Sequence, residues 1–233
     1  MQRRHRRAIV ALLGLSACGG DDATEPPVDQ NRVDLAPDRD NTLYEDPLGQ
    51  LSNGAGENFF AGVTNQPLIR RATLHFNVAG SQIPAGATID SVTLTLHVSR
   101  TNSGGATVNL HRLTAAWGEG VSDAAAAEGQ GGLAGPGDAT WTYAFYNTSQ
   151  WTNPGGDFVA TPSAAAVVLT AGSYGWRSPA MVADVQGWLD EPGGNFGWML
   201  IGDESGPITT KRFDSRENAV IENRPRLTVF FTP

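Results

Sequence analysis

Cysteine is almost absent from this 233-residue chain, in which Cys18 is the only one. A single cysteine cannot form an internal disulfide, and it cannot supply the paired thiolates of a structural zinc site. Lysine is equally scarce, since Lys211 is the sole example. A G-x-S-x-G elbow, an H-E-x-x-H helix and a phosphate-binding glycine loop are also missing. The sequence therefore gives no support for a disulfide scaffold, a thiolate metal centre or the enzyme classes that these motifs mark.

Positive charge is in short supply as well. The chain has 16 basic and 24 acidic residues, and four of the basic residues lie in the first seven positions. Beyond this segment, 12 basic residues therefore face 24 acidic ones, a net charge near −12. Such a surface does not attract nucleic acid, and it does not hold a polyanion by bulk electrostatics. We therefore expect no nucleic-acid partner.

The N-terminal residues have the layout of an export signal. A basic stretch with four arginines precedes a mainly apolar run over residues 8–17, and small residues lead into Cys18. This run is shorter than the roughly 20 apolar residues of a membrane-spanning helix, and it fits the core of a secretory signal. The tetrapeptide Leu15-Ser16-Ala17-Cys18 looks like a bacterial lipobox, in which the cysteine thiol receives a lipid.

These features predict that residues 1–17 are a lipoprotein signal peptide and that Cys18 is the lipidated first residue of the mature protein. The protein is then exported and held at the outer membrane or cell surface, and it contacts the membrane through this anchor only. Lipidation also removes Cys18 as a nucleophile. Arg6-Arg7 leaves a twin-arginine export route open. Residues 18–37, which have little to bury, are predicted to be a disordered tether.

From residue 38 onward, the dominant pattern is that of strands with one buried and one solvated face. Apolar and polar residues alternate with a period of two, and turn residues separate the segments. The strand-like segments are 72–78, 92–98, 108–111, 167–169, 198–201 and 227–231. Many short strands without helix–strand alternation favour two packed sheets. We therefore expect residues 38–233 to form one all-β domain, a single jelly-roll β-sandwich with one short capping helix.

The capping helix is predicted from the only segment with helical spacing. Ser178 stands at an N-cap position before Pro179, and apolar residues recur at helical intervals until the Pro192-Gly193-Gly194 stop. In an all-β chain such a helix most simply covers an open end of the sandwich. Residues 118–140 are expected to form a long loop excursion with little to bury, and long loops in compact domains are usually functional or disordered.

Several stretches, taken in order, resemble the DNRLRE domain, which is grouped with carbohydrate-binding module family 96. Examples are Asp40-Asn41-Thr42-Leu43-Tyr44-Glu45 and Phe213-Asp214-Ser215-Arg216-Glu217. The full set is 40–45, 52–56, 71–76, 83–89, 91–94, 116–120, 151–157, 185–188, 195–197, 213–217 and 224–227. The resemblance implies a secreted bacterial β-jelly roll, often attached to polysaccharide-degrading enzymes, and some relatives bind acidic polysaccharide such as alginate. The acidic balance and scarcity of lysine depart from what an alginate-like ligand requires.

The aromatic residues suggest where a sugar would bind. An exposed ring can stack on the apolar face of a sugar, while neighbouring polar groups bond its hydroxyls. Trp188 and Trp198 are expected in the core instead, because they lie on the apolar side of the helix and inside a strand. The other tryptophans flank loops, where packing at the edge of the core is the alternative. The ligand-binding candidates are Trp117, Trp141, Tyr143, Trp151, Asp157 and Trp176, and Tyr146 could extend the platform.

Oxygen-rich loops raise the question of calcium, which takes six to eight oxygen ligands. Asp38, Asp40 and Asn41 form one such loop, which Asp46 could join, and Asp203-Glu204 form another. The spacing matches no EF-hand, and turn residues that bond their own backbone are the alternative. No other cofactor is expected.

Two further groups of polar residues have alternative interpretations. His75, His97 and His111 fall on the polar faces of their strands and could meet around zinc if those strands were neighbours. Exposed strand histidines without a metal are commoner. Charged residues near the C-terminus are expected to form ion pairs that order the approach to the last strand. They are Arg216, Glu217 and Arg224.

Three functions are compatible with these features. The favoured one is a non-catalytic lipoprotein module that binds a polysaccharide or an envelope glycan. The alternative is a structural or adhesive envelope protein that makes protein–protein contacts. A polysaccharide hydrolase or lyase comes third, because glycosidase carboxylates must lie roughly 5–10 Å apart, a spacing that no sequence motif indicates here. We therefore expect that the protein is not an enzyme.

Overall fold

The computed structural model describes residues 31–233 of the chain. The predicted signal peptide, Cys18 and residues 18–30 of the predicted tether lie outside these residues. Within 31–233, no helix combines the length and the apolar character that crossing a membrane requires.

Strands make up most of the ordered elements in the described residues. They are β1 (Asn31–Leu35), β2 (Arg39–Tyr44), β3 (Leu51–Ser52), β4 (Asn58–Val63), β5 (Ile69–His75), β6 (Thr88–Thr101), β7 (Ala106–Arg112), β8 (Gly132–Leu133), β9 (Tyr143–Phe145), β10 (Ser149–Gln150), β11 (Ala164–Val168), β12 (Gly172–Trp176), β13 (Trp198–Ile201), β14 (Lys211–Asp214) and β15 (Arg226–Thr232). The helices are α1 (Pro179–Asp190) and the short 3-10 helices η1 (Ala125–Gln130), η2 (Pro192–Gly194) and η3 (Ile221–Asn223).

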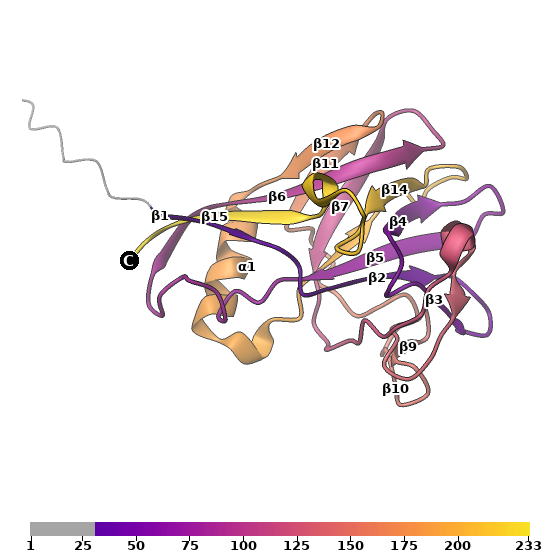
Figure 1. Ribbon diagram of the computed structural model, residues 1–233, viewed down its shortest axis with the longest axis horizontal. Helices are drawn as coiled ribbons and strands as arrows, with labels where there is room; N and C mark the ends of the chain where they lie inside the picture. The colour runs from indigo at the N-terminus through magenta and orange to yellow at the C-terminus, as the bar shows by residue number, and fades with distance from the viewer. Residues whose placement is uncertain (1–30) are drawn as a thin grey trace, which may run out of the picture.

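An 11-stranded antiparallel sheet curls over on itself to form the body of the molecule (Figure 1). Its path runs β1-β15-β6-β14-β4-β5-β13-β7-β11, with β12 added to β6 and β2 added to β5. The sheet turns at β4, which pairs with β14 on one side of the turn and with β5 on the other. The two halves therefore face each other as layers, which confirms the predicted all-β sandwich with one short helix.

The main core fills the space between these layers. In β6, Leu94, Leu96 and Val98 are fully buried, whereas the residues between them are only partly covered. Burying an aliphatic side chain of this size contributes roughly 1.5–3 kcal/mol. Alternation of this kind is what the sequence showed, and the predicted strand segments overlap β5, β6, β7, β11, β13 and β15.

Helix α1 closes one end of the sandwich, beside β6 (Figure 1). Ser178 is its N-cap and accepts a hydrogen bond from the backbone N–H of Met181 at 3.1 Å, as the sequence predicts. The helix buries four apolar residues against the core, namely Met181, Val185, Trp188 and Leu189. The ring of Trp188 lies 4.4 Å from that of Trp198, which confirms that both tryptophans belong to the core.

The predicted tether extends too far into the domain. Asn31–Leu35 forms β1, which pairs in antiparallel register with β15 from Asn31–Phe231 to Leu35–Leu227. Val33 and Leu35 are half-buried and pack against the core, because they alternate with solvent-facing residues. The domain therefore includes residues 31–37, which the prediction assigned to the tether. The start of β1 and the C-terminus lie at one end of the molecule, and η1, the rose-coloured coil beside β3, lies at the other (Figure 1).

A second, smaller core lies on the outer face of the half-sheet that contains β2 and β13. Leu43 and Met199 project outward from these strands and meet Trp117, Ala139 and residues of the segment 140–158. From the excursion 118–140, Ala139 belongs to this core, whereas Val121 and Leu133 are exposed, in line with the expectation that this stretch has little to bury. The excursion also includes η1 and β8, which pairs with β3.

Candidate functional site

Three of the predicted ligand-binding tryptophans are buried. Trp117 and Trp176 are fully enclosed and Trp151 nearly so, which leaves no ring face for a sugar. Each indole N–H donates to a backbone carbonyl at 2.9 Å. The acceptors belong to Phe196, Val108 and Thr140 for Trp117, Trp176 and Trp151 respectively. The prediction of ligand contact is therefore wrong for these residues, because their rings are packed inside the protein.

The other three candidates remain partly exposed but have partners within the chain. The guanidinium of Arg71 lies 5.0 Å from the Trp141 ring and forms a bidentate ion pair with Glu204. Tyr143 packs edge-on against Tyr146, with 5.5 Å between ring centroids. The Asp157 carboxylate accepts two backbone N–H groups of its own loop, at 2.7 and 3.0 Å. These bonds lower the pKa of Asp157, against the opposing effect of its partial burial.

The three candidate calcium ligands do not converge. Asp38 bonds the imidazole of His75 at 2.5 Å. The Asn41 amide is buried and donates to the hydroxyl of Ser52 at 2.9 Å, so it serves the fold. Asp40 points elsewhere, toward carboxylates that the sequence did not group with it. Alternation along β2 points Asp40 and Asn41 to opposite faces, and Asp38 lies before the strand begins.

In the described residues, the three histidines do not meet as a zinc site would require, and Asp203 and Glu204 do not form a shared calcium site. His75 and His111 lie on strands that flank β13, whereas His97 lies in the other half of the sheet. His97 bonds Asp214 at 2.6 Å, and His111 bonds the Val159 carbonyl at 2.9 Å. Asp203 and Glu204 bond different partners. Asp203 accepts the N–H of Ser205 in its own turn, and Glu204 pairs with Arg71.

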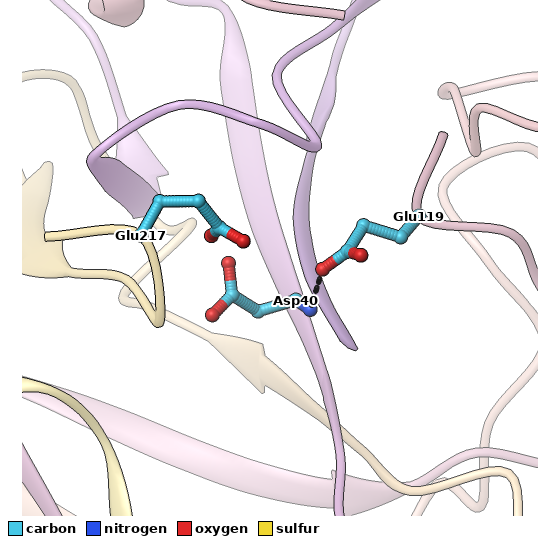
Figure 2. A group of neighbouring side chains, drawn as sticks. All are labelled: Asp40, Glu119 and Glu217. Atoms are coloured by element: carbon cyan, nitrogen blue, oxygen red, sulfur yellow. Dashed lines mark hydrogen bonds between the residues drawn. The ribbon is translucent and has the colours of Figure 1, made fainter. Parts of the chain in front are cut away.

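Asp40, Glu119 and Glu217 form a cluster of carboxylates instead (Figure 2). One oxygen from each lies within 4.8 Å of the others. The side chains of Asp40 and Glu217 point toward each other, and the backbone N–H of Asp40 donates to Glu119 at 2.8 Å. Arg216 supplies the compensating charge: its guanidinium binds both oxygens of Glu119 at 2.6 Å and lies 2.8 Å from Glu217.

The position of these groups alters their proton affinities. Burial raises the pKa of Asp40 well above its usual range, and the negative charge of Glu217 adds to the effect. Burial likewise raises the pKa of Glu217, although Arg216 opposes it. Hydrogen bonding to Glu119 raises the pKa of Arg216. The Arg216 guanidinium already bonds both oxygens of Glu119, so the cluster contains its own cation. Three carboxylates alone also supply fewer than the six to eight oxygen ligands that calcium takes.

The cluster ties together segments that carry the resemblance given above. Ser215 donates to the Gly56 carbonyl at 2.7 Å, and the backbone N–H of Arg216 donates to Asp40 at 2.8 Å. The Asn41 side chain donates to the Glu119 carbonyl at 2.9 Å. The expected ion pairs near the C-terminus thus exist for Arg216 and Glu217, whereas Arg224 donates to the Asn218 carbonyl. We infer that these polar residues hold the 116–122 loop and the turn after β14 to β2.

A further candidate site is a hollow beside η1, which we call the η1 groove. It consists of two adjoining parts of about 450 and 470 Å³ that share Thr64, Asn65, Gly129 and Gln130. Polar residues line most of both parts. The first part also contains Arg100, Arg212 and Asn102, and the second contains Glu45, Asp46 and Arg70.

A row of three residues crosses the strands beneath the first part. Phe60 of β4 is opposite Arg212 of β14, and Arg212 is opposite Arg100 of β6. Phe59 faces the core and stacks on Phe213, so Phe60 is left on the groove side of β4. Arg212 donates to the Ser99 hydroxyl at 3.0 Å. Within residues 31–233, neither Arg100 nor Arg212 has a carboxylate at ion-pair distance.

Glu128 faces these arginines across the groove. Its carboxylate accepts the backbone N–H of Asn58 at 3.2 Å, and burial raises the pKa of the group. The sequence contained no signal for this site. Arg100 and Arg212 are far apart in the chain, and only the pairing register of β6 and β14 brings them together. The patch of positive charge is therefore local, on a domain that is acidic as a whole.

The chain was also compared with known proteins. No family model matches it, and no curated protein matches it. The resemblance to the DNRLRE domain therefore stays a prediction, and the function has to be proposed from the geometry of the site.

Proposed function

We propose that this protein is a non-catalytic module that binds a polysaccharide with anionic sugar units in the η1 groove. The observation that carries the proposal is the direct pairing of Arg100 with Arg212 without a carboxylate partner in the described residues. Like charges directly opposite each other in a sheet destabilise it. An anionic group bound between the two guanidinium groups would remove that cost.

The chemistry of the groove supports this ligand class. Guanidinium groups bind carboxylate and sulfate oxygens through paired N–H donors. Asn65, Asn102 and Thr210 add amide and hydroxyl groups for sugar hydroxyls. The second part of the groove, with Glu45 and Asp46, suits hydroxyls better than anionic groups. Two adjoining parts provide room for more than one sugar unit of a chain.

The acidic balance of the whole protein does not oppose a local anionic ligand. At physiological ionic strength, charges more than about 8 Å away are largely screened. In the first part of the groove, the two adjacent arginines outnumber the single carboxylate of Glu128.

Affinity electrophoresis of the full chain in detergent tests the proposal. Gels containing a polyuronate or a sulfated polysaccharide should retard the protein, and a neutral glucan should retard it less. Arg100→Ala and Arg212→Ala should each raise the Kd obtained from the retardation about tenfold. This change is equivalent to about 1.4 kcal/mol of binding free energy. The exposed Arg177 lies outside the groove, so Arg177→Ala is the matched control. Equal retardation of all three variants, or preference for the neutral glucan, would contradict the proposal.

A second candidate function, adhesion between copies of the chain, is favoured by one uncharged edge. Residues 158–176 contain no charged side chain, and they include β11, which pairs with no strand but β7 in the described residues. Val167 and Leu169 are more than half exposed there. Edge strands usually bear charges that block pairing with another chain. Val167→Lys should therefore reduce concentration-dependent self-association in sedimentation experiments, and a monomeric wild type would rule this function out.

A further inference from the structure

A separate groove lies beside α1. Figure 1 shows that α1 lies away from η1, at the end of the molecule where β1 starts. The groove encloses about 470 Å³, which is within the usual range for small-ligand pockets. Gly187 and Trp188 of α1 line it, together with Arg112 at the end of β7 and Glu191 after the helix. None of these residues lines the η1 groove.

The glycine at position 187 keeps this groove open. It lies in the interior of α1, where a Cβ atom would meet nothing within 4 Å and where the backbone does not require glycine. Glycine in a helix interior costs roughly 1 kcal/mol relative to alanine. Packing within residues 31–233 thus gives no reason for glycine here. An occupant of the groove would give one.

The indole N–H of Trp188 lacks a hydrogen-bond partner. The residue is 2% exposed and lines the groove, and its Nε1 atom is buried with no acceptor among residues 31–233. A buried indole N–H normally finds a partner, and leaving one unpaired costs about 1–3 kcal/mol. In this chain, Trp117, Trp151, Trp176 and Trp198 all bond theirs.

The charged groups around the groove are mixed in sign. The Asp184 carboxylate is saturated within the chain, since it accepts the N–H of Trp198 at 2.8 Å and the hydroxyl of Ser163 at 2.5 Å. Its other oxygen lies 3.2 Å from Nε of Arg112, whose side chain remains 41% exposed. Arg112 therefore keeps free donors beside the exposed carboxylate of Glu191.

This combination selects a neutral ligand that carries hydroxyl groups. An anion would meet Glu191 and Asp184, and a cation would meet Arg112. Hydroxyl groups both donate and accept, so they satisfy Arg112 and Glu191 together, and a small shift of the Trp188 ring would let its buried N–H donate to the same ligand. The small residues Ala183 and Gly187 provide the room and apolar surface that one face of a sugar ring needs. We infer that the groove beside α1 is a subsite for one neutral sugar unit, distinct from the anionic site in the η1 groove.

Binding of simple glycosides to the full chain in detergent tests this inference. The probes are the methyl glycosides of glucose, galactose, mannose and N-acetylglucosamine, followed by saturation-transfer NMR and calorimetry. At least one should bind the wild type. Gly187→Leu fills the groove and should weaken that binding at least tenfold. Trp188→Phe keeps the ring but removes the N–H, and it should weaken binding several-fold.

Gly193→Leu is the matched control, because a side chain at Gly193 also meets nothing within 4 Å but lies outside the groove. It should bind like the wild type. Far-ultraviolet circular dichroism checks that each variant folds. Arg212→Ala should leave glycoside binding unchanged, which separates this site from the proposed polysaccharide function. Failure of all four glycosides to bind, or binding by Gly187→Leu equal to that of the wild type, would overturn the inference.

Discussion

Around Asp40, three carboxylates lie within a few ångströms of one another, and two of them, Glu119 and Glu217, share the guanidinium of Arg216. The cluster is arranged so that Arg216 neutralises Glu119, while Asp40 and Glu217 face each other with raised pKa values. Such a pair is most stable when it retains a proton. The fold therefore binds protons at these positions that the unfolded chain releases near pH 4.

Stability should depend on pH through this cluster. A group whose pKa is raised by folding stabilises the protein below its unfolded pKa, and this contribution is lost as the pH rises through the folded pKa. Asp40→Asn mimics the protonated form and still offers an acceptor to the Arg216 N–H. Relative to the wild type, we expect this variant to gain unfolding free energy from about pH 4 upward, at most by about 1.4 kcal/mol per pH unit.

Urea unfolding at several pH values between 4 and 8 measures this difference. Glu222 is exposed and has no hydrogen bond among the described residues, so Glu222→Gln serves as the control and should follow the wild type at every pH. An Asp40→Asn difference that stays constant with pH would show that the carboxyl group does not retain its proton.

At the scale of elements, a helix or strand could be predicted from the sequence only where its pattern of apolar and polar residues is local. The capped helix and the alternating strands were predictable because their signals lie within about ten consecutive residues. β1 was missed because it is short and polar, and its apolar residues gain their partners only from β15. β12 was missed because Gly172-Ser173-Tyr174-Gly175-Trp176 lacks apolar alternation and depends on pairing with β6.

The cap of α1 gives a test at this scale. Ser178 accepts the N–H of Met181 and donates to the carbonyl of Ser163, so it ties the helix to the strand layer. Ser178→Ala should cost about 1 kcal/mol of unfolding free energy, which lowers the melting temperature by roughly 2–4 °C for a domain of this size. Ser173→Ala, on an exposed strand position, should leave it unchanged. Equal melting temperatures for both variants would show that the cap contributes little.

At the scale of the whole molecule, the candidate sites were the least predictable part. Aromatic residues near loops indicated a sugar platform, but the segment 113–158 folds back and buries Trp117 and Trp151 in a second core. The pairing of Arg100 with Arg212 depends on strand register, and the groove beside α1 depends on the packing of a helix on a sheet. Neither arrangement has a local sequence signature.

The pairing of β1 with β15 also determines how the domain would respond to mechanical load. β1 starts at one end of the molecule and η1 lies at the other (Figure 1). A ligand held near η1 and an anchor ahead of Asn31 would pull along the axis of β1. The five β1–β15 residue pairs would then be loaded together in shear, instead of one after another as in peeling. If the predicted anchor and the proposed binding groove are both present, β1 would carry the force between them.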